Sequence, residues 1–332
     1  MPKLKSVWVV VLSLLLTACG SGGGGGGGGS STSTTTTTST GTSYTAAAAI
    51  GELLTYTLDT TSLTYSYTIT ESQYGLTGKT GSGTLTANGD GTYTPSGAPN
   101  ARVAVLPNGL LIGGIRETIN GVSRTIPIIG LSNPVTTMAS LEATYNAVAV
   151  RCWSGTCGTA YSTFHINADG TWVSCPYSDY DADPFGCTGR QIGTVNSLGG
   201  GKWQVWNNGT DIGTALVFAS GAQKVVIVDL KDSRVGGFGY GLTVGSTKTA
   251  VTNADANGTW RFNSLSGISS TIIVSNGTYT SSLDNYQTTY TLTLNSPWDG
   301  LVAPQPGGHA ILAGSGVYVF ENAGYFSIGL KR

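Results

Sequence analysis

The sequence predicts an all-β protein made of antiparallel meander, barrel or sandwich domains with tight hairpins. Its main strand signal is a strict alternation of apolar and polar residues in 63–69, which 54–58 and 290–294 repeat. Because successive side chains of a strand point to opposite faces, this alternation places one face in a core and the other in water. No stretch of ten or more residues carries a comparable helical stripe.

Regularly placed turn dipeptides are the second observation behind this fold class. Asparagine and aspartate followed by glycine tolerate the positive φ angles that two-residue hairpin turns require. Their spacing of roughly 8–15 residues is typical of sandwiches and barrels. The dipeptides are Asn88-Gly89, Asp90-Gly91, Asn108-Gly109, Asn120-Gly121, Asp169-Gly170, Asn208-Gly209, Asn257-Gly258 and Asn276-Gly277.

Two continuously apolar runs, 215–219 and 225–228, predict strands that are covered on both faces. Ser220-Gly221 lies between them and predicts a tight hairpin.

A weak internal repeat bears on domain organisation. Segments 84–93, 163–172 and 271–279 each read as strand, glycine turn, threonine and aromatic residue, although hairpins in general share this pattern. The turn signal Ser132-Asn133-Pro134 supplies the best boundary. We therefore expect an N-terminal β-domain over 44–136 and a C-terminal β-domain over 137–332, which the repeat would divide into 137–246 and 247–332.

The N-terminus predicts export. Lys3 and Lys5 precede a short apolar run, 7–16, as in a secretory signal peptide. Leu16-Thr17-Ala18-Cys19 resembles the lipobox of bacterial lipoproteins. This resemblance implies a signal peptide over 1–18, acylation (palmitate) of Cys19 as the first mature residue, and, with Gly20 rather than aspartate next, the outer membrane. The alternative is an ordinary cleavage site followed by a free cysteine.

A low-complexity segment over 19–43 follows, with glycine throughout 22–29 and then a serine and threonine tract. Such a composition has little to bury and predicts a disordered tether spanning roughly 25–30 Å. Polyglycine after a lipidated cysteine resembles Gram-negative surface lipoproteins, including transferrin-binding and complement-regulator-binding types. The resemblance is confined to about the first 43 residues, and it leaves open whether the body faces the cell surface or the periplasm.

The charge balance argues against nucleic acid as a partner. Charged residues make up 10% of the chain, against about 25% in ordinary domains. Without Lys3 and Lys5 the chain has 14 basic and 17 acidic residues, a net charge of −3. A near-neutral protein of this kind lacks the basic stripe that nucleic-acid binding needs.

Four cysteines besides Cys19 predict two disulfides in an oxidising compartment: Cys152, Cys157, Cys175 and Cys187. Their spacing does not suit a zinc site. If 160–166 and 171–175 form a meander with the strand that ends near Cys152, all four gather at one rim. Local pairs, Cys152 with Cys157 and Cys175 with Cys187, are then the simplest of the three connectivities.

Aromatic residues near these cysteines suggest a recognition surface. Trp153, Tyr177, Tyr180 and Phe185 lie in or beside loops that the disulfides would stiffen. Tryptophan and tyrosine dominate binding energy where they meet a partner, and a glycan or a protein would suit such a rim. Alternatively, the rings fold over a barrel mouth as a plug.

Alternating carboxylates in the same segment suggest a weak calcium site. Asp179, Asp181 and Asp183 could converge on one ion, but the rest of an EF-hand loop is missing. Three carboxylates in an exposed loop are otherwise simply solvated. No other cofactor is expected.

The pattern of residues favours a binding protein over an enzyme. The chain has two histidines, His165 and His309, and its folded region has neither a G-x-S-x-G elbow nor an H-E-x-x-H zinc motif. We therefore expect a non-catalytic binding or adhesive body at the cell envelope. A structural envelope or appendage-associated lipoprotein without a discrete ligand is the alternative. A glycan-acting enzyme comes third, because it would need paired carboxylates in a cleft.

Overall fold

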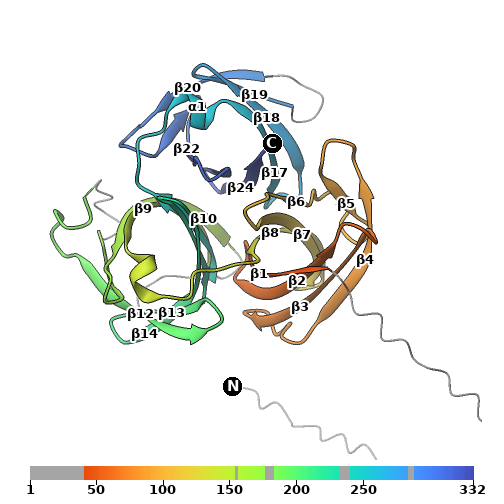
Figure 1. Ribbon diagram of the computed structural model, residues 1–332, viewed down its shortest axis with the longest axis horizontal. Helices are drawn as coiled ribbons and strands as arrows, with labels where there is room; N and C mark the ends of the chain where they lie inside the picture. The colour runs from red at the N-terminus through yellow and green to blue at the C-terminus, as the bar shows by residue number, and fades with distance from the viewer. Residues whose placement is uncertain (1–40, 154–155, 176–182, 232–239, 283–287) are drawn as a thin grey trace, which may run out of the picture. The chain divides into compact units, whose positions relative to one another are not determined.

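The computed structural model describes residues 41–153, 156–175, 183–231, 240–282 and 288–332 (Figure 1). Within these residues the chain forms three eight-stranded antiparallel sheets, one four-residue α-helix and one four-residue 3-10 helix. The all-β prediction is therefore confirmed. In the part of the chain that the structure describes, no helix is both long and apolar enough to cross a membrane.

The first sheet runs in the order β5-β4-β3-β2-β1-β8-β7-β6. Tyr93 and Val103 form an isolated antiparallel bridge that joins its two edges and closes it as the first barrel. Its strands are β1 (Thr42–Ala48), β2 (Glu52–Asp59), β3 (Thr64–Ser72), β4 (Thr80–Ala87), β5 (Tyr93–Pro95), β6 (Ala104–Val105), β7 (Leu110–Ile119) and β8 (Val122–Leu131).

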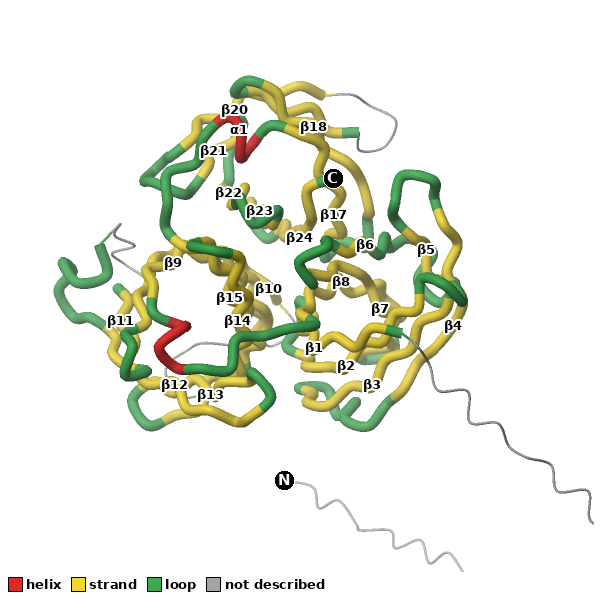
Figure 2. The backbone as a smooth tube through the Cα atoms, in the orientation of Figure 1, coloured by secondary structure: helices red, strands yellow, loops and turns green. Residues whose placement is uncertain are grey.

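The second sheet is a closed barrel in which each strand pairs with the next and β16 pairs back to β9. The 3-10 helix η1 (Met138–Leu141) precedes it, and Figure 2 shows η1 and the ring of strands. The strands of this second barrel are β9 (Ala143–Trp153), β10 (Thr156–Ile166), β11 (Thr171–Ser174), β12 (Gln191–Gly199), β13 (Lys202–Asn207), β14 (Thr210–Ser220), β15 (Gln223–Leu230) and β16 (Tyr240–Thr247).

The third sheet closes in the same way, by pairing β24 with β17. It follows helix α1 (Asn253–Ala256), whose first turn is held by a capping box between Thr252 and Asp255. The strands of this third barrel are β17 (Gly258–Ser264), β18 (Ser269–Ser275), β19 (Thr278–Ser281), β20 (Thr288–Leu294), β21 (Val302–Pro304), β22 (His309–Leu312), β23 (Val317–Asn322) and β24 (Tyr325–Lys331).

Several of the expected hairpin turns have the conformation that their residues favour. Asn120-Gly121, Asn208-Gly209 and Asn276-Gly277 have positive φ at both positions, between 46° and 78°. They join β7 to β8, β13 to β14 and β18 to β19. This is the primed turn whose twist matches that of the flanking strands.

Apart from the exposed Ala219, the two continuously apolar runs are covered on both faces, as predicted. They belong to the hairpin of β14 and β15, in which Ser220 pairs with Gln223. Val217 and Val226 pack inside the second barrel, whereas Leu216 and Ile227 point outward. The outward residues join a core cluster that includes buried residues of all three barrels, which we call the shared core.

The interior of the first barrel is filled by its own aromatic side chains. Tyr56 lies between Tyr65 and Tyr67, with ring centroids 5.8 and 6.5 Å away and nearly parallel planes. The Tyr67 hydroxyl donates to buried Glu117 at 2.8 Å, and Lys79 pairs with the same carboxylate.

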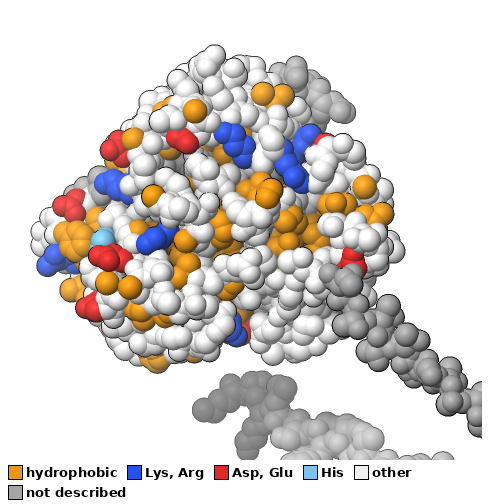
Figure 3. All heavy atoms as spheres, in the orientation of Figure 1, with side chains coloured by type: hydrophobic (Ala, Val, Ile, Leu, Met, Phe, Trp, Pro, Cys, Tyr) orange, Lys and Arg blue, Asp and Glu red, His pale blue; other side chains and the backbone are white. Residues whose placement is uncertain are grey.

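The charges on one face of the molecule are sparse and scattered, in keeping with the composition (Figure 3).

Candidate ligand-binding site

The interior of the third barrel contains a well-formed cavity. It measures about 1130 Å³ including its mouth, and we call it the third-barrel cavity. An eight-stranded barrel is wide enough to hold either its own side chains or one small ligand. The lining comprises Phe262, Ile272, Val274, Tyr279, Ser281, Tyr290, Leu292, Pro304, Pro306, Gly307, Ala310, Leu312, Tyr318, Phe320, Asn322 and Tyr325.

Strand register explains why these side chains share one interior. Ile272 of β18 lies opposite Ser281 of β19, and Val274 lies opposite Tyr279, which in turn faces Tyr290 of β20. Directly opposed residues point to the same face of a sheet. The period-two pattern therefore carries apolar and aromatic residues to the inside of successive strands.

One end of this barrel, which we call its base, is closed. The indole Nε1 of Trp260 donates to the Ala256 carbonyl of α1 at 2.9 Å. Lys331 Nζ lies 5.6 Å from the centroid of the Trp260 ring and donates to the carbonyls of Ala254 and Asp255. The cation–π contact and the two hydrogen bonds hold α1 across the base, so the opening is at the opposite end.

Aromatic rings form much of the cavity wall. Tyr279 and Tyr290 are stacked, with centroids 5.0 Å apart and planes 28° apart. Phe320 and Tyr325 are tilted, with centroids 5.9 Å apart. Offset and tilted arrangements of this kind leave ring faces and edges available to an apolar guest.

The described lining is electrically neutral. It contains no lysine, arginine, aspartate, glutamate or histidine. Burial raises the pKa of Tyr279 to about 12, and it raises the pKa of Tyr325 although the neighbouring Ser264 and Ser327 hydroxyls lower it. These phenols therefore stay uncharged at physiological pH.

A second cavity lies inside the second barrel and measures about 770 Å³ including its mouth. Its lining includes the apolar side chains of Phe164, Trp172 and Ile212, and the Arg151 side chain also lines it. Cys175 and Gln191 line it as well; Cys175 follows β11 and is joined to Cys187 by the second disulfide, and Gln191 begins β12. The remaining lining is Ser162, Ile166, Ser174, Val195, Val205, Ala215, Val228, Leu230 and Thr243.

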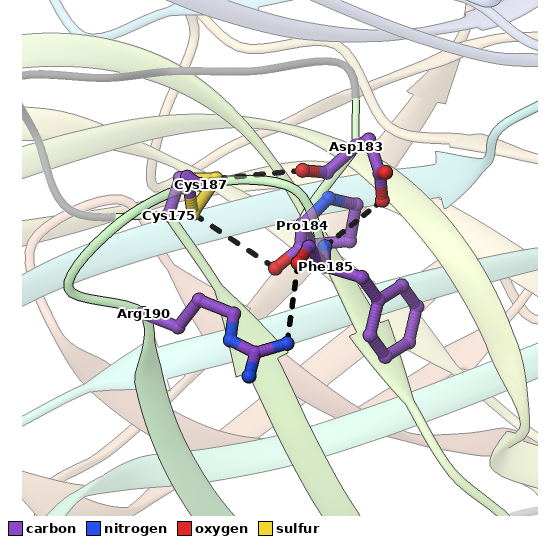
Figure 4. The surroundings of a disulfide bond; sticks show 6 residues. All are labelled: Cys175, Asp183, Pro184, Phe185, Cys187 and Arg190. Carbon is purple, nitrogen blue, oxygen red and sulfur yellow. Dashed lines mark hydrogen bonds between the residues drawn. A yellow bond between two sulfur atoms is a disulfide. The ribbon is translucent and has the colours of Figure 1, made fainter.

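The structure contains two disulfides, as the fold prediction required, and both join neighbours in sequence. Cys152 and Cys157 are directly opposed on β9 and β10. Cys152 is 1% exposed and belongs to the shared core, so this disulfide packs between barrels. Cys175 and Cys187 close the loop after β11, where Cys175 Sγ and Cys187 Sγ approach the carbonyls of Asp183 and Pro184 (Figure 4).

The aromatic residues expected at the rim are only partly described. Phe185 is 47% exposed, and its ring packs against His165 on the outer wall of the second barrel, with centroids 5.0 Å apart. Arg190 donates to the Phe185 carbonyl at 3.2 Å (Figure 4). Trp153 is the last residue of β9, but its side chain, like all of Tyr177 and Tyr180, lies outside the described residues.

The calcium prediction also falls largely outside the described residues, which exclude Asp179 and Asp181. Asp183 Oδ1 accepts a hydrogen bond from the Phe185 N–H at 2.9 Å, which forms a local turn. Among described residues, no group of three or more His, Cys, Asp or Glu side chains is placed to hold a metal ion. Cys19 likewise lies outside the described residues.

Sequence reasoning missed the third-barrel cavity. The signal was present as aromatic and apolar residues at alternate positions, such as Tyr290 and Leu292 or Tyr318 and Phe320. Aromatic residues at alternate strand positions, however, equally predict a filled interior, as in the first barrel.

Comparisons with known proteins name no family. No family model and no curated protein matches this chain. Among solved structures, it is similar to transferrin-binding protein B from Haemophilus parasuis Hp5, a vaccine antigen crystallised as a double alanine mutant, with 9% identity and a TM-score of 0.22. The match covers 85% of this chain and 66% of that one, just under two thirds of its length. A TM-score of 0.22 is too low to relate the folds strand by strand, so this likeness carries no argument about site or ligand.

Proposed function

We propose that this chain is a non-catalytic, lipid-anchored envelope protein that binds an apolar small molecule inside its third barrel. The third-barrel cavity carries the proposal. It is enclosed by strands, closed at its base by α1 and lined mainly by apolar and aromatic side chains. A concave, mostly apolar cavity with a few polar groups is the usual form of a small-molecule site.

A neutral dye tests this function directly. The chain with Cys19→Ala, which removes the acylation site, would be titrated with N-phenyl-1-naphthylamine, whose fluorescence rises in apolar surroundings. Ala310 is buried and lines the cavity, so Ala310→Phe would fill it. We expect this variant to weaken dye binding by about tenfold or more, because the ring occupies the ligand volume.

Ala215→Phe is the matched control, because Ala215 is equally buried and lines the cavity of the second barrel instead. Ala310→Leu adds less volume and keeps the test meaningful should Ala310→Phe not fold, as judged by circular dichroism. Dye binding that is lost in Ala215→Phe but unchanged in both Ala310 variants would refute the third barrel as the site.

The anchor is proposed from the sequence. The lipobox-like residues Leu16-Thr17-Ala18-Cys19 and the following low-complexity segment support attachment to the outer membrane. Metabolic labelling with palmitate should mark the natural chain and leave Cys19→Ala unlabelled. Protease treatment of intact cells, with lysed cells as control, would distinguish a surface body from one facing the periplasm.

A glycan or protein site at the rim of the second barrel is a second candidate. It is favoured by the placement of Cys175 and Gln191 on the wall of that barrel's cavity, which puts the Cys175–Cys187 disulfide beside that cavity. Combined replacement of Trp153, Tyr180 and Phe185 by alanine should abolish any signal of the natural chain on a glycan array. An unchanged signal in a folded triple variant would remove this candidate.

A further inference from the structure

The third-barrel cavity differs in chemistry between its base and its mouth. The base can be located because Asn257, which follows α1, pairs with Asn276 of the β18–β19 turn through two hydrogen bonds. Strand β19 therefore runs from the base to the mouth and ends at Ser281. By the same directions, the aliphatic residues Val274, Leu292 and Leu312 belong to the base half.

The mouth half carries the hydrogen-bonding groups. Ser281 and Asn322 are the residues with which β19 and β23 end, and both line the cavity. The Tyr279 hydroxyl is already engaged, because it donates to the Gln305 carbonyl at 3.3 Å. A guest that enters through the mouth and extends toward the base therefore has its leading end against apolar walls and its trailing end beside polar groups.

Ser281 is a polar group of the mouth half that lacks a hydrogen-bond partner, as does the buried hydroxyl of Tyr325, which also lines the cavity. Its residue is 7% exposed, and its Oγ is buried without a hydrogen bond. It lies opposite Ile272, which lines the cavity, so its side chain is on the inner face. A buried hydroxyl without a partner is unfavourable, and a guest that offers a hydrogen-bonding group there would satisfy it.

Charge on the guest is disfavoured by the same lining. The described wall contains no ionised side chain, so an ion that entered would lose its hydration without gaining a counter-charge. The stacked pair of Tyr279 and Tyr290 and the tilted pair of Phe320 and Tyr325 instead favour flat rings.

We infer that the ligand is an uncharged, ring-containing amphipath that lies with its apolar end at the base and a hydroxyl or comparable hydrogen-bonding group beside Ser281. This inference rests on the proposed function, because it specifies the class of molecule that the same cavity takes.

Three fluorescent probes with one ring system test the inference: 1-pyrenemethanol, 1-methylpyrene and 1-pyrenecarboxylate. We expect the Cys19→Ala chain to bind pyrenemethanol about 5- to 10-fold more tightly than methylpyrene, the ratio that one net hydrogen bond supplies. Pyrenecarboxylate should bind at least about tenfold more weakly than pyrenemethanol, because its charge must be desolvated.

Ser281→Ala should abolish the preference for pyrenemethanol over methylpyrene while leaving methylpyrene binding unchanged. Ser282→Ala is the matched control, because Ser282 is exposed and makes its hydrogen bonds through the backbone. Equal binding of pyrenemethanol and methylpyrene, tight binding of the carboxylate, or a preference that survives Ser281→Ala would overturn the inference.

The two proposals fail in distinguishable ways. Probe binding that Ala310→Phe blocks, but that shows no discrimination among the three pyrenes, would overturn the ligand class and leave the proposed function standing. Absence of any binding that Ala310→Phe blocks would overturn both.

Discussion

The side chain of Asn263 is hydrogen-bonded to the backbone of Arg102 in both directions. The Arg102 N–H donates to Asn263 Oδ1 at 2.7 Å, and Asn263 Nδ2 donates to the Arg102 carbonyl at 2.8 Å. Nδ2 also donates to the Gly113 carbonyl of β7 at 3.1 Å. Since Asn263 belongs to β17, one side chain that is only 3% exposed joins the third barrel to the first.

Asn263→Ala should therefore lower the free energy of unfolding by about 2–4 kcal/mol, because three buried backbone groups lose their partner. Asn263→Asp should be no better, since a carboxylate would face two carbonyl oxygens. Asn133→Ala, at an exposed position, should change stability by less than about 0.5 kcal/mol. Urea unfolding followed by tryptophan fluorescence measures all three, and equal midpoints for the natural chain and Asn263→Ala would contradict the prediction.

Gly193 of β12 is expected to tolerate no side chain. A Cβ there would overlap the Trp206 carbonyl and the Trp172 indole, which are joined by a 2.9 Å hydrogen bond. Gly193→Ala should destabilise the chain by more than about 2 kcal/mol. Gly158→Ala is the control, because a Cβ at this strand glycine meets open space. Thermal unfolding should separate the two variants clearly; similar melting temperatures would show that the second barrel absorbs the extra methyl group.

Acid should stabilise the fold through Glu52. Burial raises the pKa of this carboxyl to about 7, against hydrogen bonds from Ser72 and Gln73 that lower it. Burial, with Glu71 and Glu52 nearby, also raises the pKa of Asp229 well above its usual value, while Lys231 lowers it. A carboxyl whose pKa is higher in the folded state favours folding at low pH, and this contribution is lost as pH rises from about 4.5 through 7.

We expect the natural chain to be about 2 kcal/mol more stable at pH 5 than at pH 8 through Glu52 alone. Glu52→Gln should flatten this dependence, and Asp229→Asn should flatten it further at higher pH. Urea midpoints at the two pH values give the comparison. The attribution to Glu52 fails if Glu52→Gln retains the full pH dependence.

Replacing the Cys152–Cys157 disulfide by serines should destabilise the fold more than replacing Cys175–Cys187, although Cys152–Cys157 closes the shorter loop. Closing 12 residues restricts the unfolded chain by about 3 kcal/mol and closing 5 by about 2 kcal/mol. Replacing both members of the Cys152–Cys157 pair by serine would also bury a hydroxyl in the shared core, at a cost of about 1–3 kcal/mol. We therefore expect that double variant to melt below the Cys175/Cys187 double serine variant under non-reducing conditions. Alanine pairs, which add no hydroxyl, should restore the order set by loop length.

Local pattern was enough to predict the fold class. Alternation in 63–69 corresponds to β3, and the apolar runs 215–219 and 225–228 form a hairpin with both faces covered. An even number of cysteines in a chain whose N-terminus predicts export was enough to predict two disulfides. These features depend on residues that are close in sequence, because the alternation of apolar residues and the conformational preferences of turn residues are local properties.

The third-barrel cavity exists only because the first and last strands of that barrel pair, and this pairing could not be predicted from the sequence. Phe262 and Tyr325 line one space because β17 pairs with β24, some sixty residues later. Ser281 looks like any other serine of a polar strand until its register with Ile272 is known. The rim residues Trp153, Tyr177 and Tyr180 remain predictions.

The shared core has a consequence for dissecting this protein. Because each barrel closes on itself, each looks suitable for production as a separate fragment. Yet Val148, Phe218 and Ile328 lie on outer faces and are buried only because the other barrels cover them. A single excised barrel would expose this stripe of apolar side chains to water and should self-associate. Fragments meant for binding studies would therefore need polar replacements along the stripe.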